Sequence, residues 1–148
     1  LGPWLLGTTK NTTGTTASTT VNTGCTVVSQ SKNVVFGTLT GNAISIPAGS
    51  QIVDIKVVTT TVFSAATTLK LSNGGTDFTT TGTITDVGSV TLGANATTPA
   101  LWLNTGSTNV FITYTMAGTA LTTGAATIII TYAVRDSSGN QTQPASQV

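Results

Sequence analysis

The stretch Gln51–Phe63, QIVDIKVVTTTVF, decides the predicted fold, because apolar and β-branched residues alternate along it with a period of two. One face carries the odd positions Val53, Ile55, Val57, Thr59, Thr61 and Phe63. Asp54 and Lys56 fall on the opposite face. This pattern predicts a long β-strand with one buried side and one solvated side. The segment Pro47-Ala48-Gly49-Ser50 ahead of it has the residues of a turn.

A second long strand is predicted at Gly124–Val134. One face carries Ile128, Ile130, Tyr132 and Val134, and the other carries Thr127, Ile129 and Thr131. The first face is suited to a core. The second face is also partly apolar, so a contact between this face and a neighbouring surface is a further possibility.

Shorter β-branched segments recur between these two, at the spacing typical of sandwiches and barrels. They are Thr26–Ser29, Val34–Leu39, Ala43–Ile46, Thr67–Ser72, Phe78–Asp86, Ser89–Leu92, Ala100–Leu103 and Asn109–Met116. Turn residues separate them, as in Ser72-Asn73-Gly74-Gly75. No ten-residue window has the apolar period of a helix. We therefore predict an all-β, jelly-roll-like antiparallel sandwich of eight to ten strands in which helix is minor or absent.

The composition argues against most catalytic chemistry. Among 148 residues only 6 % are charged, histidine and glutamate are missing, and threonine is the commonest residue. Threonine suits a pleated surface through its branched Cβ, and its hydroxyl keeps an uncharged outer face hydrated. The net charge of +1 without a basic run predicts no nucleic-acid binding. No apolar run has the length of a membrane helix, so no membrane partner is expected either.

Few residues are left for a reactive site. Cys25 is the single cysteine, so it has no internal disulfide partner, and we interpret it as a buried small hydrophobe or as a thiol that bridges two chains. Asp77 and Asp86 flank one predicted strand, but their spacing fits no calcium loop and we expect solvated carboxylates. We therefore predict no enzyme activity, no catalytic residue, no metal and no cofactor.

The chain is predicted to divide into three parts: an extended Thr-rich arm at 1–23, a sandwich at 24–136 and a tail at 137–148. The arm begins with the apolar group Pro3, Trp4, Leu5 and Leu6, which needs a surface to cover it. That surface is either the chain's own domain or another subunit or shell protein. We predict these four residues as the contact element.

Trp102, the second tryptophan, lies between Leu101 and Leu103 in the predicted strand Ala100–Leu103. Exposed tryptophans often stack on carbohydrate, but a tryptophan within a strand is more typical of a core or a subunit interface. We favour the core or interface interpretation.

Two segments carry a family resemblance. Ile46–Val57, IPAGSQIVDIKV, is a turn that leads into a long alternating strand, and Leu121–Tyr132, LTTGAATIIITY, is a closing Gly-Ala strand. Together they resemble jelly-roll cement (decoration) proteins of tailed bacteriophage heads, including those of cyanophages, over roughly residues 42–134. The resemblance implies a homotrimer on the outer surface of the virion capsid, where it clamps the major capsid protein across capsomer junctions. It brings no catalytic or ligand motif with it.

Two other functions remain open. The same sandwich suits a phage tail, fibre or surface adhesin module that binds a receptor or glycan. It also suits a polymerising subunit whose N-terminal arm completes the sheet of the next copy.

Overall fold

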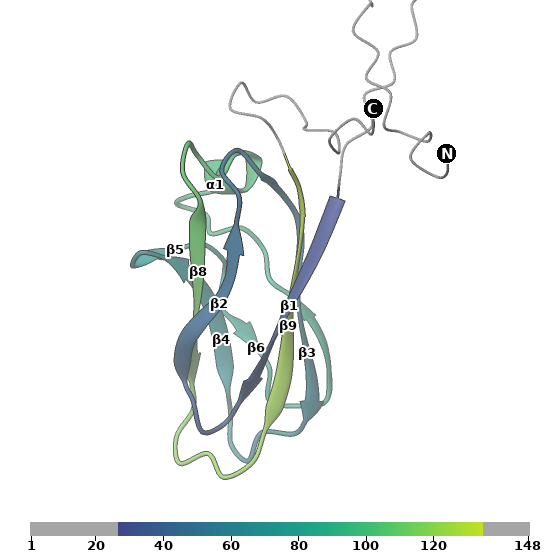
Figure 1. Ribbon diagram of the computed structural model, residues 1–148. Helices are drawn as coiled ribbons and strands as arrows, with labels where there is room; N and C mark the ends of the chain where they lie inside the picture. The colour runs from purple at the N-terminus through teal and green to yellow at the C-terminus, as the bar shows by residue number, and fades with distance from the viewer. Residues whose placement is uncertain (1–26, 135–148) are drawn as a thin grey trace, which may run out of the picture.

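The computed structural model describes residues 27–134. Two antiparallel sheets pack face to face as a β-sandwich, which confirms the predicted fold class (Figure 1). The first sheet, sheet A, has the order β1-β9-β3-β7, and the second, sheet B, has the order β2-β8-β4-β5, with β6 paired to β4. Within the described range no helix is long and apolar enough to cross a membrane.

The elements follow the sequence pattern closely. Sheet A contains β1 (Val27–Val35), β3 (Gln51–Thr61), β7 (Gly88–Thr91) and β9 (Ala125–Ala133). Sheet B contains β2 (Thr40–Ile46), β4 (Thr68–Asn73), β5 (Thr76–Asp77), β6 (Gly82–Thr83) and β8 (Val110–Ala117). A single turn of helix, α1 (Ala100–Leu103), lies in the connection from β7 to β8.

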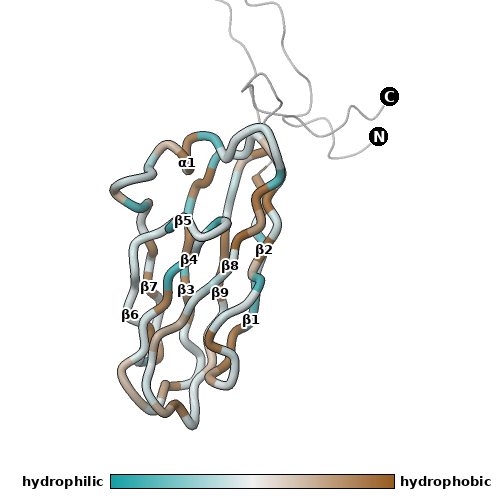
Figure 2. Tube along the Cα trace, turned by 90° about the vertical axis from the view of Figure 1, so that its left-hand side faces the viewer, coloured by the Kyte–Doolittle hydropathy of each residue, from teal (hydrophilic) through white to brown (hydrophobic). Residues whose placement is uncertain are grey.

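The core fills the space between the two sheets, and brown hydrophobic positions recur along the strands in Figure 2. Strand β9 lies in the middle of sheet A, between β1 and β3, and its Ile128 and Ile130 are fully buried. Leu69 and Leu71 of β4 are their fully buried counterparts in sheet B. Alternation with a period of two thus gives each sheet one apolar inner face, as the sequence predicts.

Strand β3 departs from the predicted alternation at two bulges. Ile55, Val57 and Thr59 are buried as predicted, but Val53 is 56 % exposed and Thr61 is also exposed. The register with β9 shifts between Ile52 and Asp54, and again between Thr59 and Thr61. Because a bulge inserts one unpaired residue, it resets which side chains point inward. The prediction was wrong at Val53 and Thr61 for this reason.

Four of the shorter predicted strands were also wrong. Ala100–Leu103 forms the helical turn α1 after Pro99, which supplies a helical φ at the start of that turn. Phe78–Asp86 does not form one strand, since within it Gly82–Thr83 pairs as β6 and Thr79 makes an isolated bridge to Ala94. Thr26–Ser29 and Val34–Leu39 are not separate, because β1 runs continuously from Val27 to Val35 along β9. Pairing with the central strand β9 keeps the polar middle of β1 in the strand conformation.

The predicted turns at 47–50 and 72–75 are confirmed. Gly74 and Gly75 both have positive φ, at 54° and 87°, and they join paired residues of β4 and β5. Two central residues with positive φ suit a two-residue hairpin, and glycine adopts that conformation at low cost. The turn at 47–50 is bonded to the loop before β8, where the Gly49 amide donates to the Gly106 carbonyl over 2.7 Å.

Candidate contact surfaces

The predicted contact element lies outside the described residues. Pro3, Trp4, Leu5 and Leu6 all precede Val27, as does Cys25. Their roles stay predictions. What the structure does give is the place where the N-terminal segment joins the domain. Val27 pairs with Ala133, so the first and last described strands meet at one end of the sandwich (Figure 1).

Trp102 packs on the sandwich from α1 rather than from a strand. Its ring centroid lies 6.2 Å from that of Phe78, which is fully buried, and its indole Nε1 donates to the Phe78 carbonyl oxygen over 2.9 Å. The indole therefore closes the edge of the core and has its polar atom satisfied. The core interpretation of Trp102 is confirmed, although Trp102 keeps part of its surface exposed.

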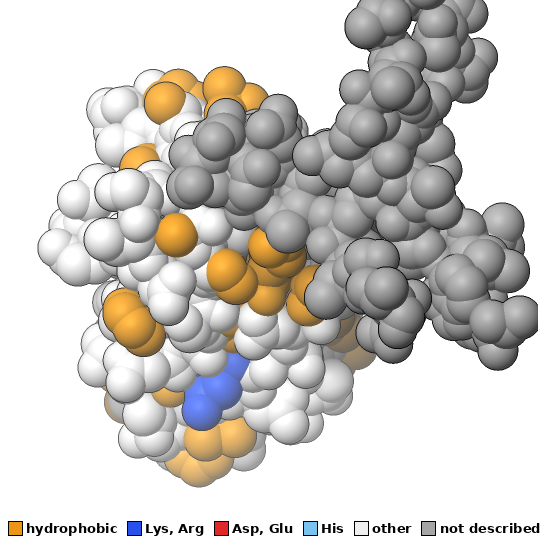
Figure 3. Space-filling model, turned by 45° about the horizontal axis from the view of Figure 1, so that its top comes forward, with side chains coloured by type: hydrophobic (Ala, Val, Ile, Leu, Met, Phe, Trp, Pro, Cys, Tyr) orange, Lys and Arg blue, Asp and Glu red, His pale blue; other side chains and the backbone are white. Residues whose placement is uncertain are grey.

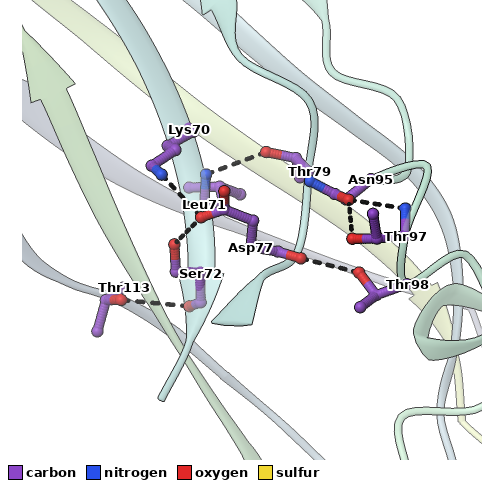
Figure 4. Close-up of polar contacts among 9 residues, drawn as sticks. All are labelled: Lys70, Leu71, Ser72, Asp77, Thr79, Asn95, Thr97, Thr98 and Thr113. Atoms are coloured by element: carbon purple, nitrogen blue, oxygen red, sulfur yellow. Dashed lines mark hydrogen bonds and ion pairs between the residues drawn. The ribbon is translucent and has the colours of Figure 1, made fainter. Parts of the chain in front are cut away.

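Asp77 belongs to a polar cluster on the outer face of sheet B (Figure 4). Its Oδ1 lies 2.8 Å from Lys70 Nζ and 3.2 Å from Ser72 Oγ. The hydrogen bond and charge of Lys70, with help from Ser72, hold the pKa of Asp77 below its ordinary value of 3.8 despite some desolvation. The Thr98 hydroxyl also donates to the Asp77 carbonyl. These contacts tie the β4–β5 hairpin to the segment before α1.

The two aspartates that flank the predicted strand are not brought together. Asp77 pairs with Ser72 near the end of β4, whereas Thr85, next to Asp86, bonds Thr67 just before the start of β4. Between residues 27 and 134 no three His, Cys, Asp or Glu side chains gather as a metal site would require.

The outer face of sheet A pairs its own polar side chains. Ser29 and Thr131 hydroxyls lie 2.6 Å apart, and the Thr127 hydroxyl lies 2.9 Å from the Asn33 amide oxygen. Between these two rows the partly exposed Ile129 faces Ser31 on one side and Lys56 on the other. Cross-strand hydroxyl bonds of this kind hold the face together. They also leave it with few unsatisfied groups for a partner.

The outer face of sheet B has a different feature at its β2–β8 side. Phe111, which is 66 % exposed, stands opposite Ser45 next to a bulge in β2. A hollow of about 360 Å³ lies here and is called the Phe111 hollow below. It is lined by Asn42, Ala43, Ile44, Ser45, Phe111 and Ile112. None of these residues carries a charge.

Exposed apolar side chains also gather at the end of the sandwich away from the termini. This loop end carries Val35, Phe36, Leu39, Val62 and Val87, all of which are more than a third exposed. The Phe36 amide donates to Gly124, and the Thr123 hydroxyl donates to the Val62 carbonyl, so the loops that carry these residues are bonded together. Orange side chains mark the lower end of the space-filling view in Figure 3, beside a blue lysine or arginine side chain. Exposed apolar side chains that gather on loops bonded to one another are typical of a surface that contacts another protein.

Sequence reasoning missed both of these surfaces. The predicted strand Asn109–Met116 includes Phe111 but does not say which face Phe111 lies on. Apolar residues alternate with Phe111 along this strand, at Val110, Ile112 and Tyr114. This alternation would have predicted that the Phe111 ring points outward. The loop end had no comparable signal, because its members come from three separate connections.

Comparison with protein-family models gives no match, and neither does comparison with curated proteins. Among solved structures, the chain is similar to a chain of the acid-stable capsid structure of Helicobacter pylori bacteriophage KHP30. The TM-score is 0.54 at 9 % sequence identity, and the match covers 72 % of this chain and 86 % of that one. At this identity the likeness concerns the fold: the chain shares its β-sandwich architecture with a chain from a phage capsid structure.

Proposed function

We propose that this chain is a phage capsid protein of the cement, or decoration, kind. In this role it binds the outer surface of the head as a homotrimer and bridges copies of the major capsid protein. The observation that carries the proposal is the shared fold with a chain from a phage capsid structure, over 86 % of that chain. The resemblance of residues 42–134 to head decoration proteins agrees with it.

A cement protein acts through binding alone. A protein that binds the assembled shell and not its free subunits stabilises the shell by mass action, and many copies multiply a modest contact energy. The described residues suit this mode, because their surface has few charges and its apolar groups gather at the loop end. We propose the loop end as the face that meets the capsid.

The first test is the copy number of the chain in purified virus particles. Quantitative mass spectrometry against the major capsid protein should give a fixed ratio, with on the order of hundreds of copies per particle, since avidity requires many sites. Heads that lack the protein should then lose their DNA at a lower temperature, and adding the protein back should restore them. Absence from the particle would overturn the proposal.

The loop end can be tested by substitution. Replacing Phe36 and Leu39 with Ser should lower occupancy on heads, because both side chains are more than a third exposed and lose apolar contact area. Val53→Ser is the matched control, since Val53 is 56 % exposed on β3, near the opposite end of the sandwich. Equal occupancy for the double variant and the control would exclude the loop end as the contact face.

A receptor-binding module of a phage tail or fibre is the second candidate, and Phe111 favours it. An exposed aromatic ring beside the Asn42 amide and the Ser45 hydroxyl is a platform on which a sugar could stack. The copy number separates the two functions, because a tail module is present in few copies. Binding to a glycan array that is lost in Phe111→Ser would support this candidate.

A further inference from the structure

The Phe111 hollow has the properties of a surface that is normally covered. Phe111 exposes 66 % of its surface, and an aromatic ring of this size gains free energy when it leaves water. Among the hydrogen bonds of residues 27–134, the side chains of Asn42 and Ser45 have no partner, although both line the hollow. The site therefore offers one aromatic ring, the methyl group of Ala43 and two unpaired polar groups.

We propose that the chain's own segment Pro3-Trp4-Leu5-Leu6 folds back and covers the Phe111 hollow. The N-terminal segment enters the domain close by, because β1 starts at Val27 and the Gln30 amide donates to the Ser45 carbonyl over 3.2 Å. Gln30 lies three positions after Val27 in β1, a distance of about 10 Å along the strand. The Gln30 side chain spans the rest of the way to Ser45, which lines the hollow, so the hollow lies on the side of the sandwich where the arm leaves.

The connecting segment has the length to make this contact without strain. Residues Gly7 to Thr26 are rich in threonine and glycine. A random coil of this length has a root-mean-square span of about 25 Å, which is on the scale of the path from Val27 along β1 and across the Gln30 side chain to Ser45. Tethering at this range gives an effective concentration of about a millimolar, so even a weak contact forms within one chain before it forms between chains.

The chemistry of segment and hollow also matches. Trp4 supplies a flat ring that can pack on Phe111, and its indole N–H needs an acceptor, which the Asn42 amide oxygen or the Ser45 hydroxyl provides. Neither Pro3 to Leu6 nor the lining of the hollow carries a charge, so no ion has to be desolvated on docking. A tail, fibre or capsid partner would meet the hollow only after displacing this segment.

Acrylamide quenching of Trp4 fluorescence tests the proposal on the free, full-length protein. Trp102→Phe removes the other tryptophan and keeps a ring against Phe78. In this background Phe111→Ser should raise the quenching constant at least about twofold, because the indole loses its cover. Val53→Ser, an exposed valine on sheet A, is the matched control and should leave the constant unchanged.

A second measurement avoids the Trp102 substitution. In protein labelled with 5-fluorotryptophan, Trp4→Phe assigns the two ¹⁹F resonances, and the Trp4 resonance should move to the free tryptophan position in Phe111→Ser alone. The shift should persist from about 100 µM to about 1 µM protein, since a contact within one chain does not depend on concentration. A shift lost on dilution would assign the segment to a neighbouring copy and overturn the proposal.

Two other outcomes would also overturn it. Trp4 could be as accessible in the parent protein as in Phe111→Ser, or it could gain protection only when the protein is bound to heads, which would make it a shell contact. Because all of the measurements except the last use the free protein, the result does not depend on whether the capsid function is correct.

Discussion

The two sheets share one core but differ on their outer faces. Sheet A pairs its outer hydroxyls across strands, as between Ser29 and Thr131, with the partly exposed Ile129 between the rows. Each outer face carries an ion pair, Lys56 with Asp54 on sheet A and Lys70 with Asp77 on sheet B, but only sheet B has an exposed ring, Phe111, beside a hollow. Both faces come from the same uncharged, Thr-rich composition. The difference teaches that self-pairing, more than composition, decides which face is available to a partner.

The largest effect should come from the inner face of sheet A. Ile130→Ala should lower the free energy of unfolding by about 2–5 kcal/mol, because Ile130 is fully buried between the sheets and its loss leaves a cavity. Ile129→Ala, one residue away on the outer face, should cost much less because Ile129 is only partly buried. Urea denaturation of both variants measures the contrast. Equal costs would mean that the outer face of sheet A is buried in the native assembly.

A smaller effect is expected where β9 enters sheet A. Gly124 has a φ of 138°, and a Cβ added there would overlap the ring of the buried Phe63. Gly124→Ala should therefore cost about 1–3 kcal/mol, through overpacking and backbone strain. The matched control is Gly37→Ala, because a Cβ at Gly37 meets nothing within 4 Å. The midpoint temperature of thermal unfolding should be well below that of the control for Gly124→Ala. Similar midpoints for the two variants would show that the Phe63 ring can move aside.

The smallest effect should come from the charged cluster on sheet B. The pKa of Asp77 is lowered in the folded protein, first by the hydrogen bond from Lys70, so its stabilising contribution is present above the ordinary value of 3.8. It is lost as the pH falls through the lowered folded pKa. Because the pair is exposed, the contribution is small and weakens with salt.

The Asp77→Asn variant tests the direction of this pH dependence of stability. The variant should reduce the loss of stability on acidification at low salt, and the difference from the parent protein should shrink at high salt. Asp86→Asn removes a carboxylate near the other end of β4 and leaves the Lys70–Asp77 pair in place, so it is the matched control. A parent profile identical to that of Asp77→Asn at low salt would show that the ion pair contributes nothing.

Much of the fold could be predicted from the sequence because its long strands have a simple period. The alternation in Ala125–Ala133 places Ile128 and Ile130 inside as expected. The bulges at Val53 and Thr60 could not be predicted, since a bulge depends on how β3 fits against β9 rather than on its own residues. The helical turn at Ala100–Leu103 was missed because four apolar residues suit a short strand or a helical turn equally well.

Some properties of the candidate surfaces also follow from the sequence, and others depend on the tertiary structure. The sequence by itself determined an all-β sandwich with a scarcely charged, hydroxyl-rich surface, because side-chain period and composition are local properties. Only the tertiary structure decided that Phe36, Leu39 and Val62 gather at one end and that Phe111 borders a hollow beside the start of β1. Such surfaces join residues from separate strands and loops, and their neighbours are set by strand order and register, which no single segment encodes.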